Sequence, residues 1–145
     1  MNKLSQHYAT LAATAADIGE VDNAISFLDR ASAANPTLAE LDVARQKIQQ
    51  ATTAQAAIDE LLQQASTYRA GGALINPPGE NAAELYHRVL ATDPDSVIAS
   101  QGLNEVVSQV LNTANQLLVA GELEDLQRLV DRSSAVALDP LAVNE

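Results

Sequence analysis

Apolar residues recur at intervals of three and four along nearly the whole of this 145-residue chain, and alternating apolar and polar positions form no run of useful length. Because an α-helix has about 3.6 residues per turn, this spacing gathers apolar side chains on one helical face. The pattern breaks at Gly19, Asn35-Pro36, Gly71-Gly72, Asp93-Pro94 and Gly121. The sequence therefore predicts an all-α chain of about six helices.

The third and fifth of these helices are expected to be long. The expected helices lie over residues 4–18, 21–34, 37–70, 81–93, 96–120 and 123–138. The third keeps its apolar stripe in one phase, which favours a continuous helix with Thr52-Thr53 as its weakest point. Thr37 with Glu40 predicts a capping box, and Asn81 with Glu84 predicts a similar cap. Between residues 73 and 80, two prolines and a glycine indicate a surface loop.

Composition limits the kind of core that these helices can form. Hydrophobic residues make up 47% of the chain, but aromatic residues only 3%. The core must therefore consist of Ala, Leu, Val and Ile, which suits helices that approach each other closely. A chain of this length buries one modest core. We expect residues 1–140 to form a single helical repeat domain and residues 141–145 a tail.

The charge of the chain disfavours two classes of partner. With 19 acidic and 8 basic side chains, the formal charge is −11. This charge repels phosphate backbones and anionic bilayers, so nucleic acids and membrane surfaces are disfavoured. No apolar run approaches the ~20 residues that span a bilayer, and the first residues lack the apolar segment of a signal peptide. Since the helical pattern begins at once and the sequence stops soon after Pro140, the chain is also compatible with a segment of a larger anchored protein.

No group of residues predicts catalysis or a bound cofactor. The chain has no cysteine, which excludes disulfides, Cys-based zinc sites and thiol nucleophiles. His7 and His87 lack a second ligand at the spacing of a metal-binding helix face, so each is expected to be an ordinary surface residue. Gly71-Gly72 lacks the following Lys and Ser or Thr of a phosphate loop and indicates a helix C-cap. The chain is therefore not expected to be an enzyme.

The helical segments repeat when they are superposed on their glycines. Small residues occupy one position of every first helix, where they allow a second helix to approach closely; they are Ala12, Ala65 and Ala114. The other matched positions of the first helices are Tyr8, Leu61 and Val110, then Ala15, Tyr68 and Leu117, then Gly19, Gly72 and Gly121. In the second helices, Ala24, Phe27, Leu28, Ala31 and Pro36 match Ala82, Leu85, Tyr86, Val89 and Pro94.

This arrangement resembles the tetratricopeptide repeat family. The first unit carries the resemblance, because its pattern of large and small positions runs from Tyr8 to Gly19 and is closed by Asn35-Pro36. The three units lie over residues 4–36, 54–94 and 103–140. Their glycines are spaced more widely than the ~34-residue period of the family. The resemblance implies antiparallel helix pairs that stack as a short solenoid and bind ligands without catalysing a reaction.

The resemblance also assigns a ligand groove to the first helix of each pair. In the first unit its positions are Gln6, Ala9, Ala13 and Asp17, and in the later units they include Leu62, Arg69, Leu111, Asn115 and Leu118. Family members that hold a C-terminal carboxylate use Lys, Arg and Asn there, and few such residues are present. We therefore expect an adaptor or assembly module that captures a peptide or helix of another protein through apolar contacts. The exposed loop residues Asn76, Pro77, Pro78 and Gly79 are a second candidate for recognition.

Two other functions are compatible with the sequence. A stripe on the third helix satisfies heptad spacing and favours a spacer or a homo-oligomerisation element. Its residues are Leu41, Ala44, Ile48, Ala51, Ile58, Leu62 and Ala65. The segment 61–94 is also similar to stretches beside membrane-anchored kinases and transducers in bacterial envelope proteins. That likeness implies a regulatory appendage of a larger envelope protein, so a periplasmic or envelope-associated location and a cytoplasmic one are both open.

Overall fold

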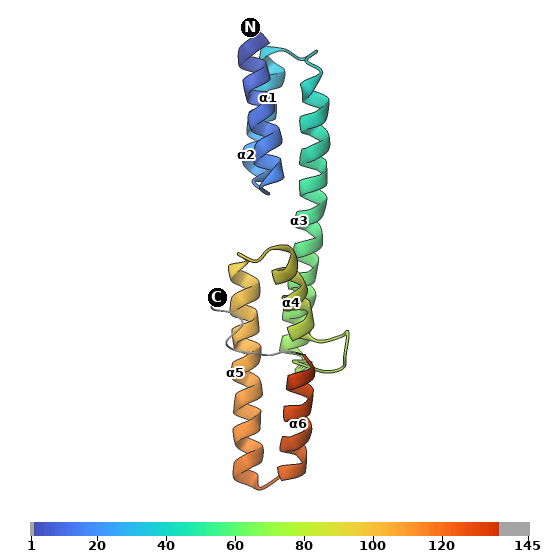
Figure 1. The fold of residues 1–145 in the computed structure, drawn as a ribbon, viewed down its shortest axis with the longest axis vertical. Helices are drawn as coiled ribbons and strands as arrows, with labels where there is room; N and C mark the ends of the chain where they lie inside the picture. Colours follow the sequence, from blue (N-terminus) through green and yellow to red (C-terminus); the bar gives the residue numbers. More distant parts are fainter. Residues whose placement is uncertain (1, 137–145) are drawn as a thin grey trace. The chain divides into compact units, whose positions relative to one another are not determined.

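The computed structural model describes residues 2–136, which form six helices and no strand (Figure 1). The helices are α1 (Asn2–Asp17), α2 (Val21–Ala34), α3 (Glu40–Ala70), α4 (Ala82–Thr92), α5 (Val97–Ala120) and α6 (Leu123–Ala135). The chain divides into two compact units, one up to Ala57 and the other from Ile58 onwards. Helix α3 therefore begins in the first unit and ends in the second. The prediction of an all-α chain with two long helices is confirmed.

The predicted glycine breaks lie at helix ends. Gly121 follows α5 with a φ of 75°, in the left-handed region that glycine reaches without strain. Its N–H donates to the carbonyl oxygens of Leu117 and Leu118, which would otherwise lack a partner at the end of the helix. Gly19 and Gly72 have the same left-handed backbone close to the ends of α1 and α3.

The largest differences from the predicted helix boundaries are at the start of α3 and the end of α6. Helix α3 begins at Glu40 and not at Thr37, because the Thr37 hydroxyl and N–H both donate to the side-chain oxygen of Asn35. Thr37 thus belongs to the turn that precedes the helix. Helix α6 ends at Ala135. Its predicted end at Leu138 and the predicted tail at 141–145 lie outside the described residues.

Helix α3 is continuous through Thr52-Thr53, as the unbroken phase of its stripe predicts. Both threonine hydroxyls donate to carbonyl oxygens one turn earlier, those of Ile48 and Gln49, at 2.8 and 2.9 Å. Such bonds satisfy the hydroxyls inside a helix without ending it. The side chains from Thr52 to Ala57 are all exposed. Helix α3 therefore has buried residues near both ends and an exposed stretch between them.

Small side chains build the core of the first unit and let α1 and α2 pack closely. Ala12 on α1 and Ala24 and Ala31 on α2 are completely buried. The Ser5 hydroxyl, also buried, donates to the carbonyl oxygen of Ala31 at 2.7 Å. The beginning of α3 supplies a third apolar stripe over this pair, formed by the buried residues Leu41, Ala44 and Ile48.

In the second unit, the end of α3 shares a larger core with α4 and α5. Its buried members are Ala65, Ile75, Ala82, Ala83, Leu85, Tyr86, Val89, Ala99, Leu103, Val106 and Val110. The ring of Tyr86 lies directly against α5 at Gly102. A methyl group at Gly102 would come within 2.3 Å of the ring carbon Cζ of Tyr86. Glycine is therefore required inside α5 to make room for this ring.

The segment that joins α3 to α4 is more than a surface loop. Ile75 is only 5% exposed and belongs to the core of the second unit, so the prediction of a surface loop is wrong for this residue. Asn81 caps α4 as predicted, since its side-chain oxygen accepts from the N–H of Glu84 at 3.0 Å. The Glu84 carboxylate in turn accepts from the N–H of Gly79 at 2.7 Å. The segment is exposed at Gly71 and Gly72, directly after α3, and at its tip, Pro77 to Glu80.

The third helix pair consists of the end of α5 and the antiparallel helix α6 (Figure 1). Leu126 and Leu129 of α6 are half-buried, whereas Leu123 and Val130 are exposed. No residue of α6 is buried. Within the described part of the chain, this pair is thus covered less completely than the other two.

Candidate functional site

The five groove residues predicted in the later units fall into two groups. Leu62 is half-buried and packs against the core of the second unit, and the guanidinium of Arg69 forms an ion pair with the Glu105 carboxylate on α5. Both side chains therefore have a role inside the fold. Leu111 and Leu118 are 58% and 57% exposed, and Asn115 between them is exposed as well. The second group is available to another molecule.

Helical geometry places Leu111 and Leu118 of α5 on the same side of the α5–α6 hairpin as two exposed apolar residues of α6. They lie seven residues apart on α5, and Leu123 and Val130 lie seven residues apart on α6, so each pair lines one side of its helix over two turns. On a helical wheel, the half-buried positions at the α5–α6 contact give the reference direction of each helix. Relative to this direction, both pairs lie on the same side of the hairpin. We call these four residues the hairpin face. Leu123 and Val130 are 63% and 47% exposed.

In the first unit, the predicted groove position Ala9 is not on a surface. Ala9 is 2% exposed and clusters with Ala31 of α2 and Leu41 of α3. The assignment of Ala9 to a ligand groove is therefore wrong. The beginning of α3 occupies the space beside α1 that the resemblance left for a ligand.

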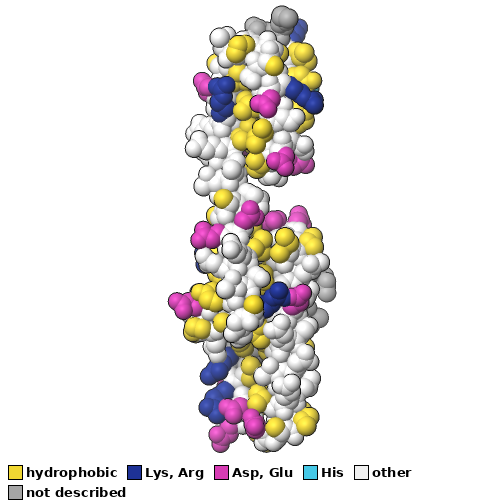
Figure 2. Space-filling model, turned by 180° about the vertical axis from the view of Figure 1, so that it is seen from behind, with side chains coloured by type: hydrophobic (Ala, Val, Ile, Leu, Met, Phe, Trp, Pro, Cys, Tyr) yellow, Lys and Arg dark blue, Asp and Glu magenta, His cyan; other side chains and the backbone are white. Residues whose placement is uncertain are grey.

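The charges that border the hairpin face are acidic. Helical geometry places Glu124 and Asp131 beside Leu123 and Val130 on α6. The Asp131 carboxylate accepts from the Gln127 amide at 2.9 Å. Figure 2 shows acidic and basic side chains together among apolar ones on the visible surface. A ligand on the hairpin face would therefore meet a negative border.

Both arginines of α6 are engaged away from the hairpin face. Arg128 pairs with Asp125 one turn earlier at 2.8 Å. The guanidinium of Arg132 donates to the side-chain oxygen of Asn76 at 3.0 Å when the Asn76 amide is oriented to satisfy both groups. The predicted recognition loop is thus attached to α6 through Asn76, while Pro77, Pro78 and Gly79 remain exposed.

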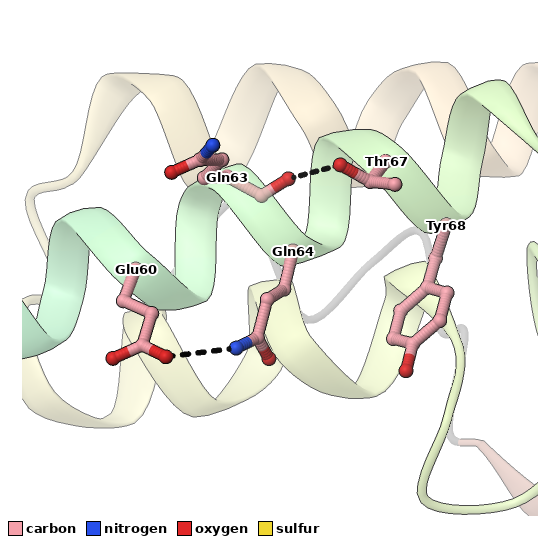
Figure 3. A pocket seen from close by; sticks show the side chains of 5 residues that line it. All are labelled: Glu60, Gln63, Gln64, Thr67 and Tyr68. Carbon is pink, nitrogen blue, oxygen red and sulfur yellow. Dashed lines mark hydrogen bonds between the residues drawn. The ribbon is translucent and has the colours of Figure 1, made fainter.

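An open depression of about 380 Å³ lies along one side of α3 (Figure 3). It is lined by Glu60, Gln63, Gln64, Thr67 and Tyr68. Two hydrogen bonds run along the helix itself: Gln64 donates to Glu60 at 3.1 Å, and the Thr67 hydroxyl donates to the carbonyl oxygen of Gln63 at 2.9 Å. All these side chains come from one helix, so the depression lacks the polar groups that converge from several elements in a catalytic site.

The two histidines have different environments. His7 is exposed, as predicted for a surface residue. His87 on α4 is half-buried, so the prediction of an ordinary surface position is wrong for it. Burial lowers the pKa of the His87 imidazole, and its Nε2 atom is buried without a hydrogen-bond partner. No other titratable group in the described residues joins it in a cluster that could hold a metal ion.

Searches found no family model, no curated protein and no solved structure that matches this chain. The resemblance to tetratricopeptide repeats therefore rests on the internal pattern of the sequence alone. None of the helices in residues 2–136 is both long enough and apolar enough to cross a bilayer.

The α6 half of the hairpin face could not be recognised from the sequence. The apolar positions of α6 are Leu123, Leu126, Leu129 and Val130. Their spacing is that of one ordinary amphipathic face, so the sequence predicts that all four pack against the rest of the chain. In the structure Leu126 and Leu129 are half-buried, whereas Leu123 and Val130 are exposed.

Proposed function

We propose that the protein is a non-catalytic interaction module that holds a peptide or helix of another protein on an apolar surface of its helix pairs. One observation carries the proposal: Leu111 and Leu118 are more than half exposed on a protein with a formal charge of −11. Water disfavours exposed leucines that share one helix face, and on soluble proteins an apolar patch usually marks a site of interaction.

The surrounding fold supports a binding role and offers little for catalysis. Packed helix pairs provide a rigid support for a surface site. Leu62 and Arg69 help to hold that support together, since they contact the core and Glu105 respectively. The ligand surface is accordingly assigned to Leu111, Asn115 and Leu118, with Leu62 and Arg69 as residues that position α5.

Charge-reversal variants test this proposal. In the double variant Leu111→Glu, Leu118→Glu, the carboxylates remain in water while the apolar surface is lost, so the free energy of unfolding should change by less than about 1 kcal/mol. Partner proteins recovered from a lysate by the immobilised chain and identified by mass spectrometry should be lost. Ile98→Glu is the control, because Ile98 is 64% exposed on the same helix. Equal recovery by the double variant and the wild type would overturn the assignment.

Homo-oligomerisation through α3 is less favoured by the packing. Leu41, Ala44 and Ile48 of its heptad-like stripe are buried in the first unit, and Ala65 is buried in the second. A copy of the chain could reach these side chains only by displacing helices of the same unit. Light scattering during size exclusion is the direct measurement, and a stable dimer at micromolar concentration would favour the oligomerisation function instead.

A further inference from the structure

Each of the first two helix pairs is covered by half of a long helix. The pair α1 and α2 is covered by the beginning of α3, where Leu41 clusters with Ala9 and Ala31. The pair formed by the end of α3 and α4 is covered by the beginning of α5, whose buried residues Ala99, Leu103 and Val106 join the same core. Covering by a third amphipathic helix is thus the way in which this chain completes a pair.

The third pair has no covering helix among residues 2–136. Its two helices leave Leu111, Leu118, Leu123 and Val130 between 47% and 63% exposed. In the first unit, the covering residues Leu41 and Ile48 are also seven residues apart and are 0% and 8% exposed. The seven-residue spacing by which α3 packs onto the first pair therefore also occurs on the hairpin face, where the side chains are exposed.

We propose that the hairpin face binds an amphipathic helix of another protein that carries Lys or Arg beside a stripe of small aliphatic residues. This inference rests on the proposed interaction function and names its partner. A stripe two turns long spans about 10 Å, so the partner helix needs at least about three turns to cover both leucines of α5. Aliphatic side chains of the partner would replace the water that now contacts Leu111 and Leu118.

The acidic border determines the charge of the partner. Glu124 and Asp131 lie beside the hairpin face, and the arginines of α6 are engaged with Asp125 and Asn76. A basic flank on the incoming helix is therefore attracted, and an acidic flank is repelled. A second copy of this chain fits poorly, because it also carries a charge of −11 and buries its own covering stripes in its own units.

The test uses a peptide taken from the covering helix of the first unit. Residues 40–55 contain the stripe Leu41, Ala44 and Ile48, and the neighbouring positions Asp42, Gln46 and Gln49 are exposed. The basic probe carries Asp42→Lys, Gln46→Lys and Gln49→Lys, and its acidic twin carries Glu at the same three positions. Fluorescence anisotropy measures the binding of each labelled probe to the full chain.

The basic probe should bind the wild-type chain, with the acidic twin at least about tenfold weaker. The variants Leu111→Glu, Leu118→Glu and Leu123→Ser, Val130→Ser should each raise the Kd of the basic probe by about tenfold or more. Ile98→Glu should leave the Kd unchanged. The circular dichroism spectrum of every variant is recorded, and the Ser variant provides a change that adds no charge.

Three results would overturn the inference. They are failure of the basic probe to bind the wild type, equal binding of both probes, and unchanged binding by both hairpin variants. A dimer of the chain that the hairpin variants dissociate would show that the occupant is a second copy. Loss of the natural partner in the Leu111→Glu, Leu118→Glu variant, combined with failure of the basic probe, would leave the proposed function intact and exclude only the basic helix as ligand.

Discussion

Gly102 shows how one residue decides the distance between two helices. Glycine inside an exposed helix usually lowers stability, and replacing it with alanine gains up to about 1 kcal/mol. At Gly102 the opposite is expected, because a methyl group would come within 2.3 Å of the Tyr86 ring. The ring is 2% exposed and cannot move out into water without losing its contacts.

Gly102→Ala should therefore lower the free energy of unfolding by about 1 to 3 kcal/mol through overpacking. Urea unfolding followed by circular dichroism measures the change. The double variant Gly102→Ala, Tyr86→Leu removes the ring from the clash, so its destabilisation should be smaller than the sum of the two single effects. A Gly102→Ala protein more stable than the wild type would contradict the close contact.

Local signals at the residue scale were predicted well, and contacts between helices were not. Asn81 and Glu84 were recognised from their spacing, because a helix cap depends on residues three positions apart. The role of Gly102 could not be recognised in this way, since the Tyr86 ring that requires it lies on another helix. The half-burial of His87 could not be predicted for the same reason, because its neighbours in sequence do not reveal what packs over α4.

At the scale of helices, the three alanines that align in the repeat differ in burial. Ala12 and Ala65 are completely buried, but Ala114 on the open third pair is only half-buried. Their common position in the repeat predicted that all three lie at close crossings. The difference follows because no helix among residues 2–136 covers α5 and α6, so a side chain at Ala114 has space on one side.

Ala12→Leu should lower the free energy of unfolding by about 1 to 3 kcal/mol, since α1 and α2 leave no space for the larger side chain. Ala114→Leu should change it by less than about 0.5 kcal/mol, as for a surface substitution. Chemical denaturation of the two variants, each compared with the wild type, measures both values. Equal destabilisation by the two changes would mean that the third pair is packed as closely as the first.

Helix lengths were predicted from phase, and their boundaries from local residues. The stripe of α3 keeps one phase, so a single helix was expected and was found from Glu40 to Ala70. Its start was misplaced because Asn35, and not Glu40, holds Thr37. The α5 half of the hairpin face was predicted through the resemblance, whereas the α6 half depends on the packing of two helices against each other.

At the scale of the whole chain, two compact units share one helix. Along this helix, the stretch from Thr52 to Ala57 separates the residues of the two cores, and all of its side chains are exposed. Its stability therefore depends on helix propensity, which its alanines supply. The composition of the chain predicted one domain with one modest core, and it gave no sign of this exposed stretch.

Ala54→Pro should break α3 at the exposed stretch at a cost of about 3 kcal/mol, because proline removes a backbone donor and clashes with the preceding turn. The cores of both units should persist, since Ala54 contributes to neither. Amide NMR spectra should keep the dispersed signals of each unit. The control Ala44→Pro, at a position that is 0% exposed, should unfold the first unit. Loss of both sets of signals in Ala54→Pro would show that the units need the intact helix.

The double use of the long helices bears on how such a chain could gain or lose copies of its repeat during evolution. The first half of α3 completes one pair and its second half starts the next. A duplication with ends in the loops would separate a pair from the half-helix that completes it. A duplication with ends in the middle of a helix would transfer both together. In this architecture, a segment that carries a complete core therefore begins and ends inside helices. A recombinant protein with its junctions at those positions should keep every transferred core complete.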